Sequence, residues 1–211
     1  MRKPLPLVAT LVVLAAVAAM IALGVWQLGR RADKAAAIAR LAQNIQLPPV
    51  AFPRFPDEAL LFRRSSLYCT RVLSTAREAG RSAAGAKGWR VIVQCGSGAE
   101  GPGQAVQLGI APSADSALAW RGGEVAGYLS YAPDHRPLLA SVFGRAPRPL
   151  MLVAATPVAG LAANPGPDLS AVPNNHLAYA VQWFAFAAIA LVIYGLALRR
   201  RMRGSIPQDS A

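Results

Sequence analysis

Charged residues are scarce in this chain of 211 residues, where they make up 15% against 54% for hydrophobic residues. This composition is too apolar for an ordinary soluble protein and too mixed for a transporter built of many membrane spans. Acidic residues are the scarcer charge, at 10 Asp and Glu against 22 Lys and Arg, and the formal net charge is +12. The length allows one domain plus membrane segments and leaves little room for a second domain.

Residues that carry catalysis or bind metals are also few. The chain has two histidines and two cysteines, with no Cys-x-x-Cys pair and no Gly-x-Ser-x-Gly, phosphate-loop or His-Glu-x-x-His motif. A dithiol redox centre, a nucleotide-binding loop and the common hydrolase sites are therefore unsupported. We predict no catalytic residues and no enzymatic activity.

Two long apolar blocks are present instead, at residues 4–29 and 177–198, and neither contains a charged residue. A helix needs about 20 apolar residues to cross a hydrocarbon layer of about 30 Å, so both blocks are long enough. We predict transmembrane helices over residues 4–29 and 174–198, one near each end of the chain.

The first block could also be a cleaved signal peptide, with Arg2 and Lys3 as its basic start. The apolar region of a signal peptide, however, is about 7–15 residues long and gives way to a polar stretch. Here the apolar run continues through Trp26 to Leu28. We therefore expect an uncleaved anchor.

The distribution of positive charge predicts the orientation. Arg2 and Lys3 precede the first block, and the tail at residues 199–211 opens with four arginines in its first five positions. Positive residues favour the cytoplasm, and two spans place both tails on the same side. The basic residues at 30–40 would then lie outside, which long loops tolerate. We expect cytoplasmic termini and an extracytoplasmic domain over residues 30–173.

Between the two blocks the apolar period changes from helical to strand-like. Apolar residues at Ile38, Leu41 and Ile45 predict a helical stalk that ends at Pro48. Strands are then predicted, between Gly and Pro clusters, at 67–73, 89–95, 104–110, 125–132 and 150–155. No helical pattern alternates with them, so a doubly wound parallel sheet is not expected. The predicted fold class is an α+β membrane protein with two transmembrane helices flanking a mainly antiparallel β domain.

The two cysteines, Cys69 and Cys95, fall in predicted strands of the outer domain. An oxidising compartment permits a disulfide between them. Two buried free thiols are an equally good interpretation, because the sequence does not fix the distance between the residues.

The outer domain is basic, with 16 basic against 9 acidic residues between positions 30 and 178, a net charge of +7. Its arginines are scattered instead of forming a stripe along one helix. Nucleic acid is not expected outside the cytoplasm, so we expect a solvated surface whose partner is anionic lipid.

The two histidines differ in their surroundings. His135 lies in a proline-bounded polar turn and is interpreted as a solvated loop residue. His176 follows Asn175, a good helix N-cap, at the outer boundary of the second span. Tyr179 and Trp183 follow at i+3 and i+7 and share its helix face. The group is either an aromatic belt at the membrane interface or an imidazole with flat apolar walls that could ligate haem iron.

Two motifs resemble the surfeit-locus family of cytochrome c oxidase assembly factors of bacterial and mitochondrial inner membranes. The first runs from Leu23 to Arg30, contains Gly24-Val25-Trp26-Gln27 and is followed by Lys34. The second runs from Asn174 to Phe184 and is similar to the family's Asn-x-His-Leu-x-Tyr-Ala motif with a Trp-Phe pair. The middle of the chain departs from the family pattern.

This resemblance implies a respiratory-chain assembly factor in the bacterial inner membrane, which assists insertion of haem a into the catalytic subunit of a haem–copper oxidase. It implies haem a synthase as a further partner and transient haem binding, with His176 as the iron ligand. Tyr179, Trp183, Trp26 and Gln27 would surround the haem, the last two from the first helix at the same membrane depth. The alternative is a cofactor-free envelope scaffold that binds a partner membrane protein.

Overall fold

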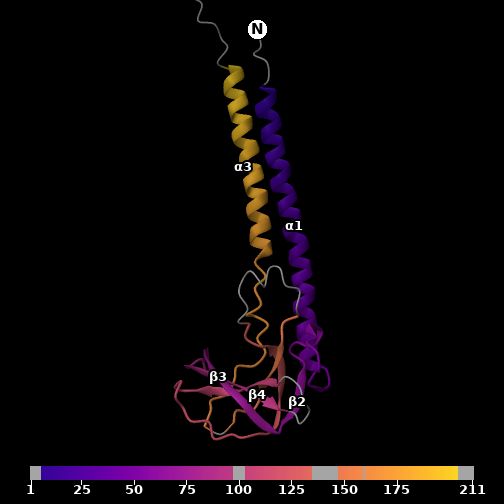
Figure 1. Ribbon diagram of the computed structural model, residues 1–211. Coiled ribbons are helices and arrows are strands. Elements are labelled where there is room, and N and C mark those ends of the chain that lie inside the picture. Colours follow the sequence, from indigo (N-terminus) through magenta and orange to yellow (C-terminus); the bar gives the residue numbers. More distant parts are fainter. Residues whose placement is uncertain (1–5, 97–102, 135–146, 159, 204–211) are drawn as a thin grey trace, which may run out of the picture. The chain divides into compact units, whose positions relative to one another are not determined.

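The computed structural model describes residues 6–96, 103–134, 147–158 and 160–203. The chain divides into two compact units: a helical unit formed by residues up to Ala37 and from Pro173 onwards, and a sheet unit over Ile38–Val172. Figure 1 shows the elements of both units.

The two long helices are α1 (Leu7–Gln46) and α3 (His176–Arg203). Both are long and apolar enough to cross a membrane. At about 1.5 Å per residue, the 40 residues of α1 extend about 60 Å, twice the thickness of a hydrocarbon layer. The helix therefore continues without a break into the segment with the Ile38 stripe and ends just before Pro48, which cannot continue a helix.

The end of α1 is fixed within the sheet unit by one buried side chain. The Asn44 amide donates to the carbonyl oxygens of Ala59 and Leu61, at 2.7 and 2.8 Å. Ala59 belongs to a short 3-10 turn, Glu58–Leu60, which Asp57 caps. These two bonds satisfy backbone carbonyl groups that no strand or helix hydrogen bond uses.

A seven-stranded sheet forms the core of the second unit. In chain order its strands are β1 (Val50–Ala51), β2 (Arg64–Cys69), β3 (Arg71–Arg81), β4 (Lys87–Gly96), β5 (Gln104–Ala111), β6 (Gly123–Tyr131) and β7 (Leu150–Ala154). The order across the sheet is β1-β2-β6-β7-β5-β4-β3. Four of the six pairings are antiparallel, while β1–β2 and β5–β7 are parallel. The predicted fold class is confirmed, and the two parallel pairings were not expected.

The predicted strand at 67–73 is wrong as a single element. β2 ends at Cys69 and β3 begins at Arg71, with Thr70 as the corner between them. The two halves pair with different neighbours, β2 with β6 and β3 with β4. Thr70 makes the corner stable because its backbone N–H and its hydroxyl both donate to the Gly96 carbonyl, at 2.9 and 2.6 Å.

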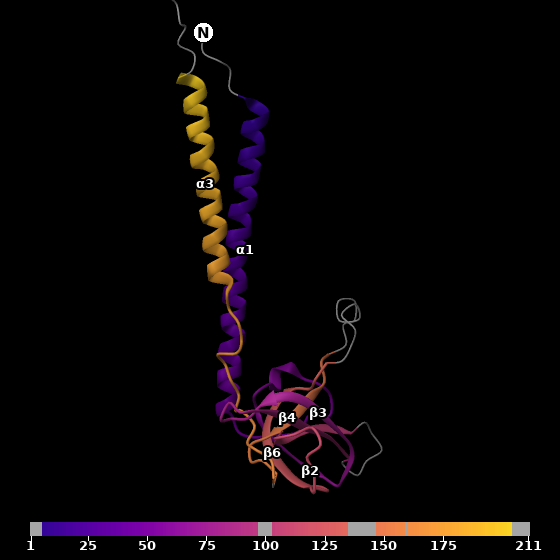
Figure 2. The same cartoon turned by 90° about the vertical axis from the view of Figure 1, so that its left-hand side faces the viewer.

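A disulfide joins Cys69 of β2 to Cys95 of β4, with the two Cα atoms 5.1 Å apart. These strands are four positions apart in the sheet. In a flat sheet, with about 4.8 Å between neighbours, they would be about 19 Å apart. The sheet must therefore curl so that β2 and β4 come together at the bridge (Figure 2). The sequence allowed either a disulfide or two buried free thiols, and the structure has the disulfide.

The core lies inside this curl. Its largest fully buried side chains are Leu108, Leu129, Leu152, Val91, Val93 and Val106, together with the two bridged cysteines. Burial of each such aliphatic side chain contributes about 1.5–3 kcal/mol relative to exposure. Every residue of β7 is buried because the strand lies between β5 and β6 near the middle of the sheet.

The segment that leaves the sheet after β7 is held by polar contacts, of which those made by Asn164 are buried. Asn164 donates to the carbonyl oxygens of Gln107 and Ala154, and its own side-chain oxygen accepts from the Gln107 amide at 2.8 Å. The Tyr128 hydroxyl donates to the Pro165 carbonyl at 2.6 Å. Burial raises the pKa of Tyr128 to about 12, so the hydroxyl keeps the proton that it donates at neutral pH.

The double variant Cys69→Ala/Cys95→Ala should lower the free energy of unfolding of the sheet unit by about 2–4 kcal/mol, because the bridge closes a loop with a sequence separation of 26. The measurement is denaturant unfolding of the full chain in detergent, followed by near-ultraviolet circular dichroism. A reducing agent should destabilise the wild type by a similar amount and leave the double variant unchanged. A wild type that is insensitive to reduction would show that the bridge does not constrain the sheet.

Candidate functional site

The two long helices run side by side and antiparallel in the helical unit (Figure 1). Buried or contacting residues recur at every seventh position on each helix, the spacing of a left-handed helix pair. These positions are Thr10, Val17 and Gly24 on α1, and Ala180, Ala187 and Tyr194 on α3. Most of these residues are small. Small residues allow close backbone approach where lipid supplies no hydrophobic driving force between helices.

The closest approach is at Gly24. A Cβ atom added there would lie 2.5 Å from the Phe184 ring, a separation that real Cβ atoms do not tolerate. The Phe184 ring therefore occupies space that only glycine leaves free. At Gly29, five residues further along α1, nothing lies within 4 Å of the same added atom. The requirement for glycine is thus specific to position 24.

One end of the helix pair is closed by a polar contact between Thr10 and Tyr194. The Thr10 hydroxyl donates to the Pro6 carbonyl at 3.0 Å, so in the contact with Tyr194 it is the acceptor. The Tyr194 hydroxyl is therefore satisfied by a side chain of the other helix. An interhelical hydrogen bond of this kind stabilises helix pairs in membranes.

The other end carries the predicted site. The backbone N–H of Tyr179 donates to the Asn175 carbonyl at 3.3 Å, which places Asn175 at the N-cap and His176 in the first turn of α3. The half-buried imidazole faces Gln27 of α1, with Nδ1 2.7 Å from Gln27 Oε1. His176 and Gln27 are 149 residues apart in the chain, and the helix pairing brings them together.

The contact determines the chemistry of the ring. The Gln27 oxygen is an acceptor only, so Nδ1 of His176 must carry the proton and donate it. In the neutral imidazole the other nitrogen, Nε2, then has a free lone pair. Ligating histidines in metal sites are typically held in this way, by a hydrogen bond from the nitrogen that does not bind the metal.

The three predicted aromatic site residues differ in their exposure. Trp26 and Tyr179 are 57% and 51% exposed, respectively. Trp183 is half-buried and contacts Phe186 edge to face, with ring centroids 6.2 Å apart. Of the five predicted site residues, His176 and Gln27 are the pair that a hydrogen bond joins in the described part of the chain. A cofactor role for all five stays a prediction.

Other side chains that could ligate a metal do not form a second site in the described residues. In the described residues no three His, Cys, Asp or Glu side chains are grouped as metal ligands would be. His135 lies outside the described residues. A metal held by protein side chains alone is therefore not supported in the described residues, whereas a haem, whose macrocycle supplies four ligand nitrogens, needs only an axial residue such as His176.

Sequence reasoning missed Gly24 and Phe184 as partners, although both lie within the two motifs. The signal that could have found them is the seven-residue spacing of Thr10, Val17 and Gly24 on the first apolar block. That spacing predicts a helix seam, but it does not identify the residue across it.

Two apolar helices that flank a mixed sheet, with a histidine–glutamine pair at one end of the helix seam, fit a membrane protein anchored near both ends of its chain. The SURF1 family model matches residues 14–188, and the chain belongs to this family. The family is known for cytochrome oxidase assembly. No match is found among the curated proteins.

Gly24→Leu should destabilise the helix pair by about 1–3 kcal/mol, since the new side chain must displace the Phe184 ring. Gly29→Leu should leave stability nearly unchanged. The measurement is the thermal midpoint of the full chain in detergent. Adding Phe184→Ala to Gly24→Leu should recover part of the loss, and strictly additive effects of the two substitutions would contradict the contact.

Proposed function

We propose that this protein is a haem a carrier in the assembly of cytochrome c oxidase, and that it passes the cofactor to the catalytic subunit of a haem–copper oxidase. The observation that carries the proposal is the hydrogen bond of 2.7 Å between His176 Nδ1 and Gln27 Oε1. It leaves Nε2 as the nitrogen available to iron, in a chain that belongs to an oxidase assembly family.

The residues present fit a haem. His176 would be the iron ligand, and Gln27 would be the positioning residue that holds its tautomer and ring orientation. Bound haem would supply the iron and its redox chemistry. The polypeptide would contribute one ligand bond to the iron.

The flanking aromatic residues support the same use. Trp26 adjoins Gln27 on α1, and Trp183 lies two turns beyond His176 on α3. Indole rings offer flat apolar surface to a porphyrin as well as a polar N–H at the membrane interface. Tyr179, which is half exposed, would contribute in the same manner.

The proposed location is the bacterial inner membrane, with the sheet unit in the periplasm and both termini in the cytoplasm. The Cys69–Cys95 disulfide supports an oxidising compartment for the sheet unit. Arg200, Arg201 and Arg203 in the last turn of α3 support a cytoplasmic end for that helix. Haem a synthase in the same membrane would supply the cofactor.

A cofactor-free scaffold is the second candidate function. The exposure of Trp26 and Tyr179 favours it, because such rings also suit an aromatic belt or contact with a partner membrane protein. The two candidates differ in one property, since only a haem carrier needs the free Nε2 of His176.

His176→Ala should abolish haem retention while the protein still inserts into the membrane, because a residue at a helix end contributes little to spanning. The measurement is the Soret absorbance per protein after co-expression with the enzymes of haem a synthesis. His135→Ala should retain haem fully, and Trp183→Leu should lose less than His176→Ala, since packing is lost but no ligand bond. Full haem content in His176→Ala, or a colourless wild type, would favour the scaffold.

Gln27→Met and Gln27→Glu test the positioning role as a matched pair. Methionine keeps the length of the side chain and removes the strong acceptor, whereas glutamate keeps an oxygen that can accept from Nδ1. Gln27→Met should lower haem affinity about 10–100-fold, the usual cost of losing such a partner. Gln27→Glu should bind nearer to wild type, with a shifted Soret maximum. Equal affinity in the wild type and Gln27→Met would remove Gln27 from the site.

A further inference from the structure

The hairpin formed by β3 and β4 places two like charges opposite each other. Arg81 and Lys87 are directly paired across the strands at the end of the hairpin. Like charges in this position destabilise a sheet unless something neutralises them. Neither side chain forms an ion pair with any residue that the structure describes.

A carboxylate of the same hairpin pairs with a different cation. Glu78 of β3 forms a salt bridge with Arg90, its direct partner on β4. Side chains alternate between the two faces of a strand, so Glu78 and Arg90 lie on the face opposite to Arg81 and Lys87. Glu78 thus neutralises Arg90 on one face, whereas Arg81 and Lys87 lie opposite each other at the turn end of the other face.

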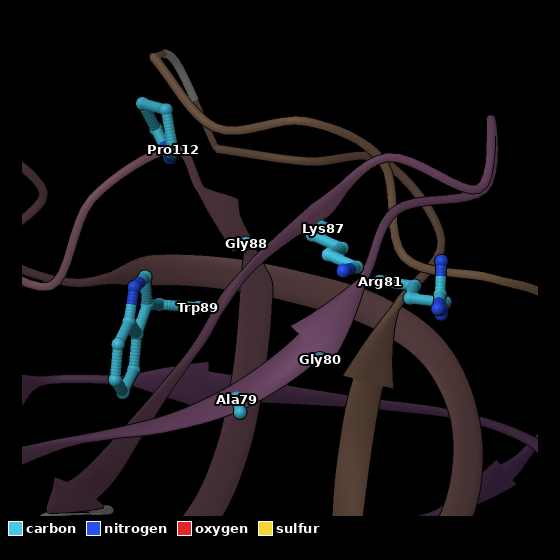
Figure 3. Close-up of a pocket in the computed structure, with 7 residues that line it drawn as sticks. All are labelled: Ala79, Gly80, Arg81, Lys87, Gly88, Trp89 and Pro112. Atoms are coloured by element: carbon cyan, nitrogen blue, oxygen red, sulfur yellow. The ribbon is translucent and has the colours of Figure 1, made fainter.

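Those two cations line a pocket of about 510 Å³ (Figure 3). Ala79 and Trp89 are the next cross-strand pair on the same face, and Pro112 completes the lining together with Gly80 and Gly88. No carboxylate lines the pocket. The pocket is shallow and open to solvent, so a ligand would lie against its surface.

The pocket has a basic end and an aromatic end. In Figure 3, Trp89 and Pro112 lie toward one side and Lys87 and Arg81 toward the other. Gly85, with a φ of 81° in the hairpin turn, directs its carbonyl to Arg81 Nη1 at 3.1 Å, which orients the guanidinium. The Trp89 side chain is 37% exposed at the opposite end.

We propose that this pocket binds the phosphate-bearing headgroup of an anionic phospholipid. The two unpaired cations complement the phosphate, and an indole ring beside them suits the boundary between headgroup and water. The two apolar helices would tether the sheet unit to a membrane, which raises the concentration of headgroups available to it. The inference does not depend on the haem proposal, because no residue of the pocket takes part in that site.

The test uses the full chain in neutral detergent micelles, titrated with phosphatidylglycerol or with phosphatidylcholine. The readout is the change in tryptophan fluorescence that is present in the wild type and absent in Trp89→Phe. Phosphatidylglycerol should give a saturable change, and Arg81→Gln/Lys87→Gln should bind it about 30-fold more weakly, at roughly 1 kcal/mol per basic residue. Arg81→Lys, which keeps the charge, and Arg121→Gln, an exposed arginine outside the pocket, should bind like the wild type.

Three results would overturn the proposal. The first is equal affinity for phosphatidylcholine, which would remove the role of net charge. The second is displacement of the lipid by inorganic phosphate at the same concentration, which would indicate a site for free phosphate. The third is displacement by an oligoglutamate peptide at a lower concentration than the lipid, which would indicate a protein partner.

Discussion

The close approach of two apolar helices at Gly24 is the constraint on which the candidate site depends. Lipid does not drive such helices together, so their contact rests on shape and on polar groups that would otherwise be unsatisfied in hydrocarbon. Gly24 leaves room for the Phe184 ring, and polar pairs close the seam near both ends. The same seam sets the distance between Gln27 and His176.

The sheet unit relies on a different device. A small domain buries a limited apolar area, and the strands of this one are drawn into a curl that brings β2 and β4 together beside Thr70. The disulfide between Cys69 and Cys95 lies at that junction and constrains the unfolded chain. The helical unit and the sheet unit are thus stabilised by separate means, shape and hydrogen bonding in one and a covalent closure in the other.

The two functional proposals draw on opposite kinds of chemistry. In the first proposal, Nε2 of His176 would offer a lone pair to iron, with its direction set by the hydrogen bond between Nδ1 and Gln27. The hairpin pocket offers two uncompensated positive charges beside an indole ring. In the proposed carrier, the first site would hold the cofactor and the second would bind lipid.

The sequence by itself determined the features that depend on local order. Apolar length predicted both long helices, and short runs between Gly and Pro clusters predicted most of the strands. The motifs around Gln27 and His176 indicated the family that the SURF1 match then identified. Only the tertiary structure decided which residues meet. Strand register decided the break at Thr70, the pairing of Cys69 with Cys95 and the opposition of Arg81 to Lys87. Helix packing decided which residue accepts the His176 proton. A one-dimensional pattern records the face on which a residue lies, but it carries no information about the atoms that the fold brings against that face.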